Sequence, residues 1–83
     1  MLNIKVLGPG CENCKKLVGL ADRAIQNLAI AANVEKVTDY SEIMKYPILS
    51  TPGLVINEKL VVSGRVPSEA EITTFITTAL LEE

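Results

Sequence analysis

An α/β fold is the architecture that this sequence predicts. Three observations predict it: apolar residues alternate with polar ones at the start of the chain, apolar residues then recur at helical spacing, and two short apolar runs precede a second helical pattern. The expected order of elements is β-α-β-α-β-β-α. With 83 residues the chain has room for one hydrophobic core, so we expect a single domain over residues 1–83.

The first strand and the first helix have the clearest patterns. Leu2, Ile4 and Val6 alternate with polar residues, and Gly8-Pro9-Gly10 ends the strand. We expect Asn33 to end the helix as a left-handed cap. The apolar face of that helix comprises Cys14, Leu17, Val18, Ala21, Ala24, Ile25, Leu28 and Ala32.

The second strand is expected at residues 34–38, parallel to the first because the helix returns the chain. Ser41 is expected to cap a short helix that ends before Tyr46-Pro47, since the residue before proline avoids helical geometry. Residues 54–56 and 60–62 are apolar runs separated by residues 57–59, which predicts a β-hairpin.

The last helix has a sequence signature at its start. Ser68 and Glu71 form the spacing of a capping box, in which each side chain bonds the other residue's backbone N–H. The apolar face that follows comprises Ile72, Phe75, Ile76, Ala79 and Leu80.

Composition excludes several classes of function. The net charge is −2 and aromatic residues make up 4%, so we expect no nucleic-acid partner. The longest nearly apolar stretch, residues 28–34, is too short to span a bilayer, and Lys5 interrupts the first strand, so we expect neither membrane span nor signal peptide. The expected protein is a cytoplasmic monomer.

The two cysteines, Cys11 and Cys14, form a C-x-x-C motif where the first strand gives way to the first helix. The chain has no histidine, and a tetrahedral metal site needs about four cysteine or histidine ligands. We therefore expect no resident metal and no cofactor. A C-x-x-C near a β-α-β pattern indicates redox chemistry, and in a reducing compartment a disulfide is more often catalytic than structural.

The two thiols are not expected to be equivalent. Cys14 lies on the apolar helix face and should be buried, whereas Cys11 should be exposed at the helix start. The helix dipole there favours the thiolate and should lower the pKa of Cys11. Lys15 and Lys16 would add to this effect, and Glu12 would oppose it. The predicted chemistry is attack by Cys11 on a partner disulfide, followed by attack of Cys14 on Cys11.

A proline lies just before the third predicted strand, in Ser50-Thr51-Pro52-Gly53. Proline is tolerated at the start of a strand, and only about 5–6% of X–Pro bonds in folded proteins are cis. Taken alone, Thr51-Pro52 is therefore expected to be trans.

Three motifs carry a family resemblance: Gly8-Pro9-Gly10-Cys11 with Cys14, Pro52-Gly53 before an apolar strand, and Gly64-Arg65-Val66 before the last helix. With the order of elements, they resemble the thioredoxin superfamily. The resemblance is closest to the small redox-active disulfide proteins of archaea and bacteria. It implies a thioredoxin fold, with a central four-stranded mixed sheet flanked by three helices.

The resemblance also implies a function and a site. The function is that of a thiol–disulfide oxidoreductase, which exchanges electrons with protein disulfides and is recharged by a disulfide reductase. Cys11 would be the attacking thiol and Cys14 the resolving one. Pro52 would be cis and lie beside the disulfide, and the Thr51 backbone would pair with the partner's chain.

The sequence departs from thioredoxins proper at several positions. Gly10 replaces the tryptophan before the first cysteine, and Glu12-Asn13 replaces the Gly-Pro between the cysteines. Lys5 falls where the buried acidic residue would be; directed at Cys14, it would favour that thiolate. Ser63-Gly64-Arg65 lacks the aspartate with which glutaredoxins bind glutathione.

Two other functions remain open from the sequence. Small copper-carrier domains also place C-x-x-C between a strand and a helix, and two thiolates suit Cu(I). Those domains have a methionine where this chain has Pro9, and they end in a strand. A dimer-bridging iron–sulfur cluster is a weaker variant of this reading. A non-catalytic adaptor with a thioredoxin fold is the remaining alternative.

Overall fold

The computed structural model describes residues 2–10 and 12–82 and has the predicted order of elements. The elements are β1 (Leu2–Leu7), α1 (Glu12–Leu28), β2 (Ala32–Val37), α2 (Tyr40–Ile43), β3 (Gly53–Ile56), β4 (Lys59–Ser63) and α3 (Glu69–Glu82). Within the described residues, no helix is both long and apolar enough to cross a membrane.

The four strands form one mixed sheet in the order β2-β1-β3-β4. Strand β1 is parallel to β2, as the intervening helix requires, and antiparallel to β3. Strands β3 and β4 form the antiparallel hairpin. The predicted α/β architecture, a four-stranded mixed sheet with three helices, is therefore confirmed.

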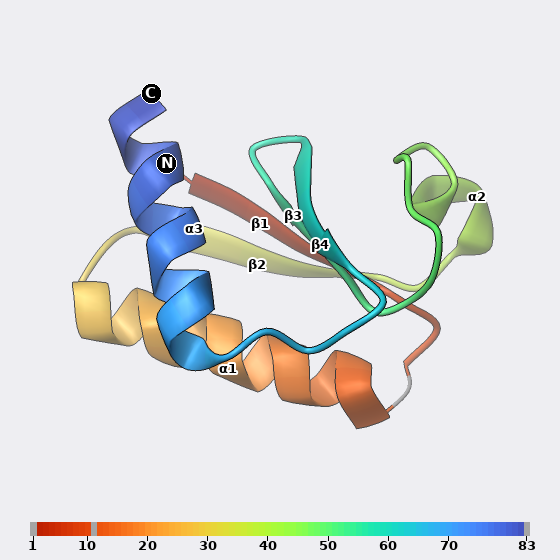
Figure 1. Ribbon diagram of the computed structural model, residues 1–83, viewed down its shortest axis with the longest axis horizontal. Coiled ribbons are helices and arrows are strands. Elements are labelled where there is room, and N and C mark those ends of the chain that lie inside the picture. Colours follow the sequence, from red (N-terminus) through yellow and green to blue (C-terminus); the bar gives the residue numbers. More distant parts are fainter. Residues whose placement is uncertain (1, 11, 83) are drawn as a thin grey trace.

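The two faces of the sheet are covered unequally. Leu2, Ile4 and Val6 alternate along β1 onto the face that α1 and α3 cover, whereas Leu7 lies on the opposite face with α2. Figure 1 shows α3 packed across α1 and α2 set apart at the other end of the sheet. The larger cluster contains Leu2, Ile4, Val6, Leu17, Ala21, Ala24, Leu54, Ile56, Val62, Ile72 and Ile76.

The predicted end of the first helix is wrong. Helix α1 ends at Leu28, and Ala29 is the left-handed residue, with φ 53°. The Ala29 N–H donates to the Gln26 carbonyl at 3.1 Å and the Ile30 N–H to the Ile25 carbonyl at 3.4 Å, the pairing of a Schellman cap. Asn33 is instead in β2, together with Ala32, because pairing with β1 extends that strand towards the helix.

Two other local predictions also need correction. Asp39, not Ser41, caps α2, and its carboxylate accepts a hydrogen bond from the Ser41 N–H at 2.9 Å. The hairpin turn has two central residues, Asn57 and Glu58, with φ 50° and 68°. Positive φ at both positions is the type I′ geometry that matches the twist of a two-stranded ribbon, so β4 begins at Lys59.

The capping box at the start of α3 is confirmed. The Ser68 N–H donates to Glu71 Oε1 at 3.2 Å, and the Glu71 N–H donates to Ser68 Oγ at 3.2 Å. Arg65 adds a paired contact, in which its two terminal nitrogens donate to the two Glu71 carboxylate oxygens at 3.2 and 2.7 Å. Arg65 and Ser68 hold the pKa of Glu71 at about 2, well below its ordinary value.

Candidate functional site

The first part of the candidate site is the junction between β1 and α1. Gly10 has φ 91°, a conformation that side chains other than glycine rarely adopt, and it redirects the chain into the helix. Cys14 follows in the first turn of α1 and is 5% exposed, which confirms its predicted burial. Cys11 lies outside the described residues, so its exposure and its pairing with Cys14 stay predictions.

The second part is the loop that leads into β3. The Thr51-Pro52 peptide bond is cis, so the trans expectation from proline statistics is wrong and the implication of the resemblance is confirmed. Pro52 is buried and Thr51 is half-buried. The Pro52 carbonyl accepts a hydrogen bond from the Gly64 N–H at 2.9 Å, which ties this loop to the end of β4.

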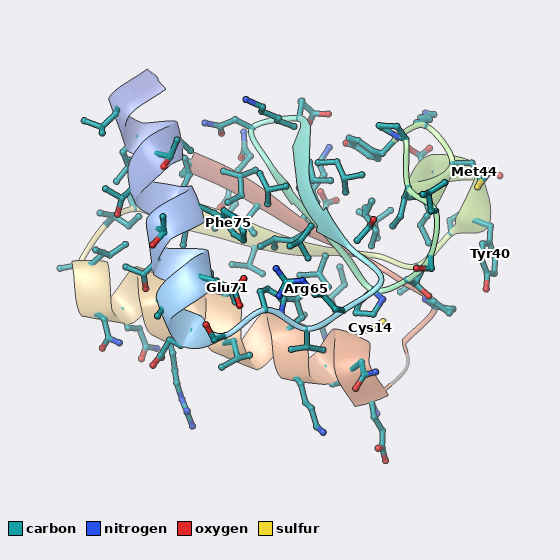
Figure 2. The ribbon with its side chains drawn as sticks, viewed as in Figure 1. Cys14, Tyr40, Met44, Arg65, Glu71 and Phe75 are labelled. Carbon is teal, nitrogen blue, oxygen red and sulfur yellow. The ribbon has the colours of Figure 1, made fainter. Side chains whose placement is uncertain are left out.

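Gly8 joins these two parts. It follows Leu7, whose pairing partner is Gly53, so the end of β1 lies beside the residue after Pro52. A Cβ built at Gly8 would overlap with Cys14 Sγ and would lie 3.7 Å from Thr51 Cβ. The structure thus brings Cys14 and Thr51 to one point, and only a residue without a side chain fits between them. Figure 2 shows Cys14 at the end of α1 that lies under this loop.

Lys5, which would favour the Cys14 thiolate if it were directed at Cys14, points elsewhere. Its ammonium donates to Glu58 Oε1 at 2.7 Å and to Tyr46 Oη at 3.1 Å, on the face of the sheet that α2 covers. The hydrogen bonds that Lys5 donates to Glu58 and Tyr46 raise the pKa of Lys5. Cys14 instead borders Val6, on the α1 face. Counting back from the cysteine selected Lys5, but strand alternation turns that side chain away.

A small hollow of about 60 Å³ opens beside Cys14. Its apolar walls are formed by Val6 and Val18, and Lys15 and Lys36 also line it. The sequence analysis missed Lys36. The available signal was the parallel pairing of the first two strands, which puts Lys36 beside Val6. Across residues 2–10 and 12–82, no three His, Cys, Asp or Glu side chains gather where they could hold a metal ion.

Comparison with known proteins identifies the family. Residues 2–77 match the thioredoxin domain family. The chain is 36% identical over 72 residues to a thioredoxin of Methanothermobacter thermautotrophicus, covering 87% of this chain and 94% of that protein. It is 35% identical over 72 residues to a thioredoxin of Methanocaldococcus jannaschii, covering 87% of this chain and 83% of that protein. These similarities support an activity of the thiol–disulfide oxidoreductase kind, and the chain belongs to the thioredoxin family.

Proposed function

We propose that this protein is a thiol–disulfide oxidoreductase that exchanges electrons with protein disulfides through Cys11 and Cys14. The observation that carries the proposal is the convergence at Gly8, where Cys14 Sγ and the Thr51 side chain approach the same point. A reactive sulfur beside a loop that can hold an extended chain is the arrangement that disulfide exchange needs. The two archaeal relatives, both thioredoxins, support the same reading.

The reaction runs in two steps. The Cys11 thiolate attacks one sulfur of a partner disulfide, which forms a mixed disulfide and releases the partner's other sulfur as a thiolate. The Cys14 thiolate then attacks Cys11 Sγ, which closes the Cys11–Cys14 disulfide and releases the partner's second sulfur as a thiolate. The partner gains two electrons, the protein loses two, and both released thiolates take protons from water.

The helix start is suited to the first step. Cys11 directly precedes α1 in the sequence, and the first-turn N–H groups of a helix carry partial positive charge that favours a thiolate. Burial of Cys14 supports its role in the second step, since a buried sulfur is reached by its neighbour before it is reached by a partner protein.

Thr51 and Pro52 form the proposed substrate-binding loop. Pro52 is buried and its carbonyl accepts a hydrogen bond from Gly64, whereas no loop hydrogen bond between the described residues involves the Thr51 backbone. In this proposal the partner's chain lies extended along Thr51 and forms strand-like hydrogen bonds with it. Partners of this kind are proteins with an accessible disulfide. A disulfide reductase returns the Cys11–Cys14 pair to the dithiol form, and in this proposal the pair itself uses no bound cofactor.

The test is reduction of a protein disulfide by single-cysteine variants. With insulin as substrate and a chemical dithiol as reductant, Cys11→Ser should abolish turnover because the attacking sulfur is gone. Cys14→Ser should also lose turnover, but it should accumulate a covalent mixed disulfide that appears on non-reducing gels.

The matched comparison between the variants makes this test specific. Both substitutions replace sulfur by oxygen at neighbouring positions, and thermal unfolding checks that each variant is folded. Undiminished turnover by Cys11→Ser would reject the proposed function. Trapping by Cys11→Ser instead of Cys14→Ser would reverse the assigned roles.

A further inference from the structure

The hollow beside Cys14 is lined by Cys14 and also by two lysines, Lys15 and Lys36. We propose that Lys36 is a positioning residue for the resolving step, and that its ammonium stabilises the Cys14 thiolate. This inference rests on the proposed function, because it concerns the second half of the same exchange reaction. It assigns a role to a residue on the strand β2, outside the C-x-x-C motif and the proline loop.

The strand register directs Lys36 towards Cys14. Lys36 pairs with Val6, and the two side chains of such a pair lie on the same face of the sheet. Val6 belongs to the cluster beneath α1, and Val34, two residues before Lys36, packs against that cluster. The Lys36 side chain therefore leaves β2 on the α1 side. It lines a hollow of only about 60 Å³ whose wall includes Cys14.

Among the described residues, Lys36 forms no ion pair. Within residues 2–10 and 12–82, the ion pairs are Lys5–Glu58, Lys45–Glu42 and Arg65–Glu71, so Lys36 has no carboxylate within bonding distance. A cation facing a small, mostly apolar hollow acts on a thiolate through a medium that screens it less than bulk water does.

The other charged groups near this end of the sheet do not cancel the effect. Lys15, from α1, lines the same hollow and adds positive charge. The acidic neighbours are Glu12, which is exposed at the start of α1, and Glu35, Asp39 and Glu42, which line a separate hollow on the α2 side that Lys36 also borders. Asp39 is bonded to the N–H of Ser41 at the start of α2. Lys15 and Lys36 are thus the charged side chains that line the hollow beside Cys14.

The consequence for the reaction concerns one proton. Cys14 must lose its proton to water before its sulfur attacks Cys11 Sγ. The S–S bond to the partner breaks as the Cys11–Cys14 bond forms, and the electron pair leaves with the partner's sulfur. Stabilising the Cys14 thiolate raises the fraction of molecules ready for this attack at neutral pH.

The experiment isolates Cys14 as the only thiol of the chain. In the Cys11→Ser background, the rate of alkylation of Cys14 by iodoacetamide is measured against pH, with and without Lys36→Gln. We expect Lys36→Gln to move the midpoint of the profile to higher pH and to slow alkylation at neutral pH by about threefold or more. Molar salt should reduce the difference between the two proteins, because the ammonium is exposed on one side.

Two control variants separate charge from structure. Lys36→Arg keeps the charge and should retain the original profile. Lys16→Gln removes an exposed lysine of α1 that does not line the hollow, and it should leave the profile in place. Equal shifts for Lys36→Gln and Lys16→Gln, or an equal shift for Lys36→Arg, would overturn the inference.

The role of Lys36 and the proposed function can be tested separately. The alkylation profile needs no disulfide exchange, whereas the insulin assay on the wild-type protein tests exchange directly. An inactive wild type would reject the function even if the profile shifts with Lys36. An active wild type with an unmoved profile would reject only the role of Lys36.

Discussion

The two faces of the sheet are stabilised in different ways. On the α1 and α3 face, eleven buried apolar residues form one cluster. On the α2 face the buried cluster of the described residues comprises Leu7, Ile43 and Val55, and α2 itself has four residues. A polar group completes this second face, in which Lys5, Tyr46 and Glu58 bond one another at 2.7 to 3.1 Å. The first face supplies most of the apolar burial, and the second depends on a few apolar contacts and hydrogen bonds.

This difference bears on the proposed site because its two halves belong to different faces. Cys14 lies in α1, on the face of the sheet that holds the larger cluster. The loop with Thr51 and Pro52 follows α2 and Tyr46, which lie on the α2 face. We call this sparsely covered face the thin face. We expect Cys14 to be held rigidly and the loop with Thr51 and Pro52 to be the half of the proposed site that is more easily disturbed.

The largest expected effects come from truncating one buried isoleucine on each face. Ile76→Ala, in the large cluster, should lower the free energy of unfolding by about 4 kcal/mol, near the upper end for buried aliphatic residues. Ile43→Ala, on α2, should cost about 2 kcal/mol, because a four-residue helix can move inward to fill the space. Urea denaturation measures both. Equal costs would show that the two faces are equally rigid.

Removing one hydroxyl tests the polar group on the thin face. Tyr46 donates to Glu58 Oε2 at 2.7 Å and accepts from Lys5 Nζ at 3.1 Å. Tyr46→Phe keeps the ring and should cost about 1 kcal/mol of stability. Tyr40→Phe is the matched control, since that ring is 62% exposed on α2, and it should change little. A cost for Tyr40→Phe as large as for Tyr46→Phe would contradict this account.

Two residues with positive φ allow a further test of the difference between the two faces. Ala29 ends α1 with φ 53°, and Glu58 forms the hairpin turn with φ 68°. Glycine adopts this conformation without steric cost, so Ala29→Gly should raise the free energy of unfolding by about 1 kcal/mol. Glu58→Gly should gain less or lose stability, because it removes the carboxylate that Lys5 and Tyr46 bind. Thermal unfolding measures the stability of both variants. An equal gain in stability would mean that the polar group of Lys5, Tyr46 and Glu58 contributes nothing.

Local patterns in the sequence were sufficient for most of the fold. The alternation in β1, the helical spacing on α1 and the capping box of Ser68 and Glu71 each depend on residues a few positions apart, and all three are confirmed. The cap at Asn33 was wrong because Ala29, which ends the helix in a Schellman cap, carries no signal: alanine rarely takes positive φ.

The site was harder to predict because it depends on which side chains face each other across the sheet. The cis bond at Pro52 followed from the family resemblance, not from the residues themselves. The close approach at Gly8 and the position of Lys36 need the register of β1 against β3 and β2. The direction of Lys5, which the sequence left open, depends on the same register, since one step along a strand reverses the face.

The smallest expected effect is a pH dependence of stability that comes from Glu71, in the first turn of α3. Arg65 and Ser68 hold the pKa of Glu71 at about 2, whereas its ordinary value is 4.5. The unfolded chain therefore takes up this proton first as the pH falls. The contribution of Glu71 to stability is fully present above about pH 4.5 and is lost progressively towards pH 2.

Glu71→Gln removes this titration and keeps the size of the side chain, so its stability should fall less steeply between pH 4.5 and 2 than that of the wild type. Urea denaturation at a series of pH values measures the slope. Glu35→Gln, at an exposed position on β2, should leave the slope unchanged. The slope cannot vanish in Glu71→Gln, because Lys5 and Tyr46 also lower the pKa of Glu58, on the thin face. If Glu71→Gln kept the full wild-type slope, the acid sensitivity would belong to the thin face, and the ion pair with Arg65 would have no part in it.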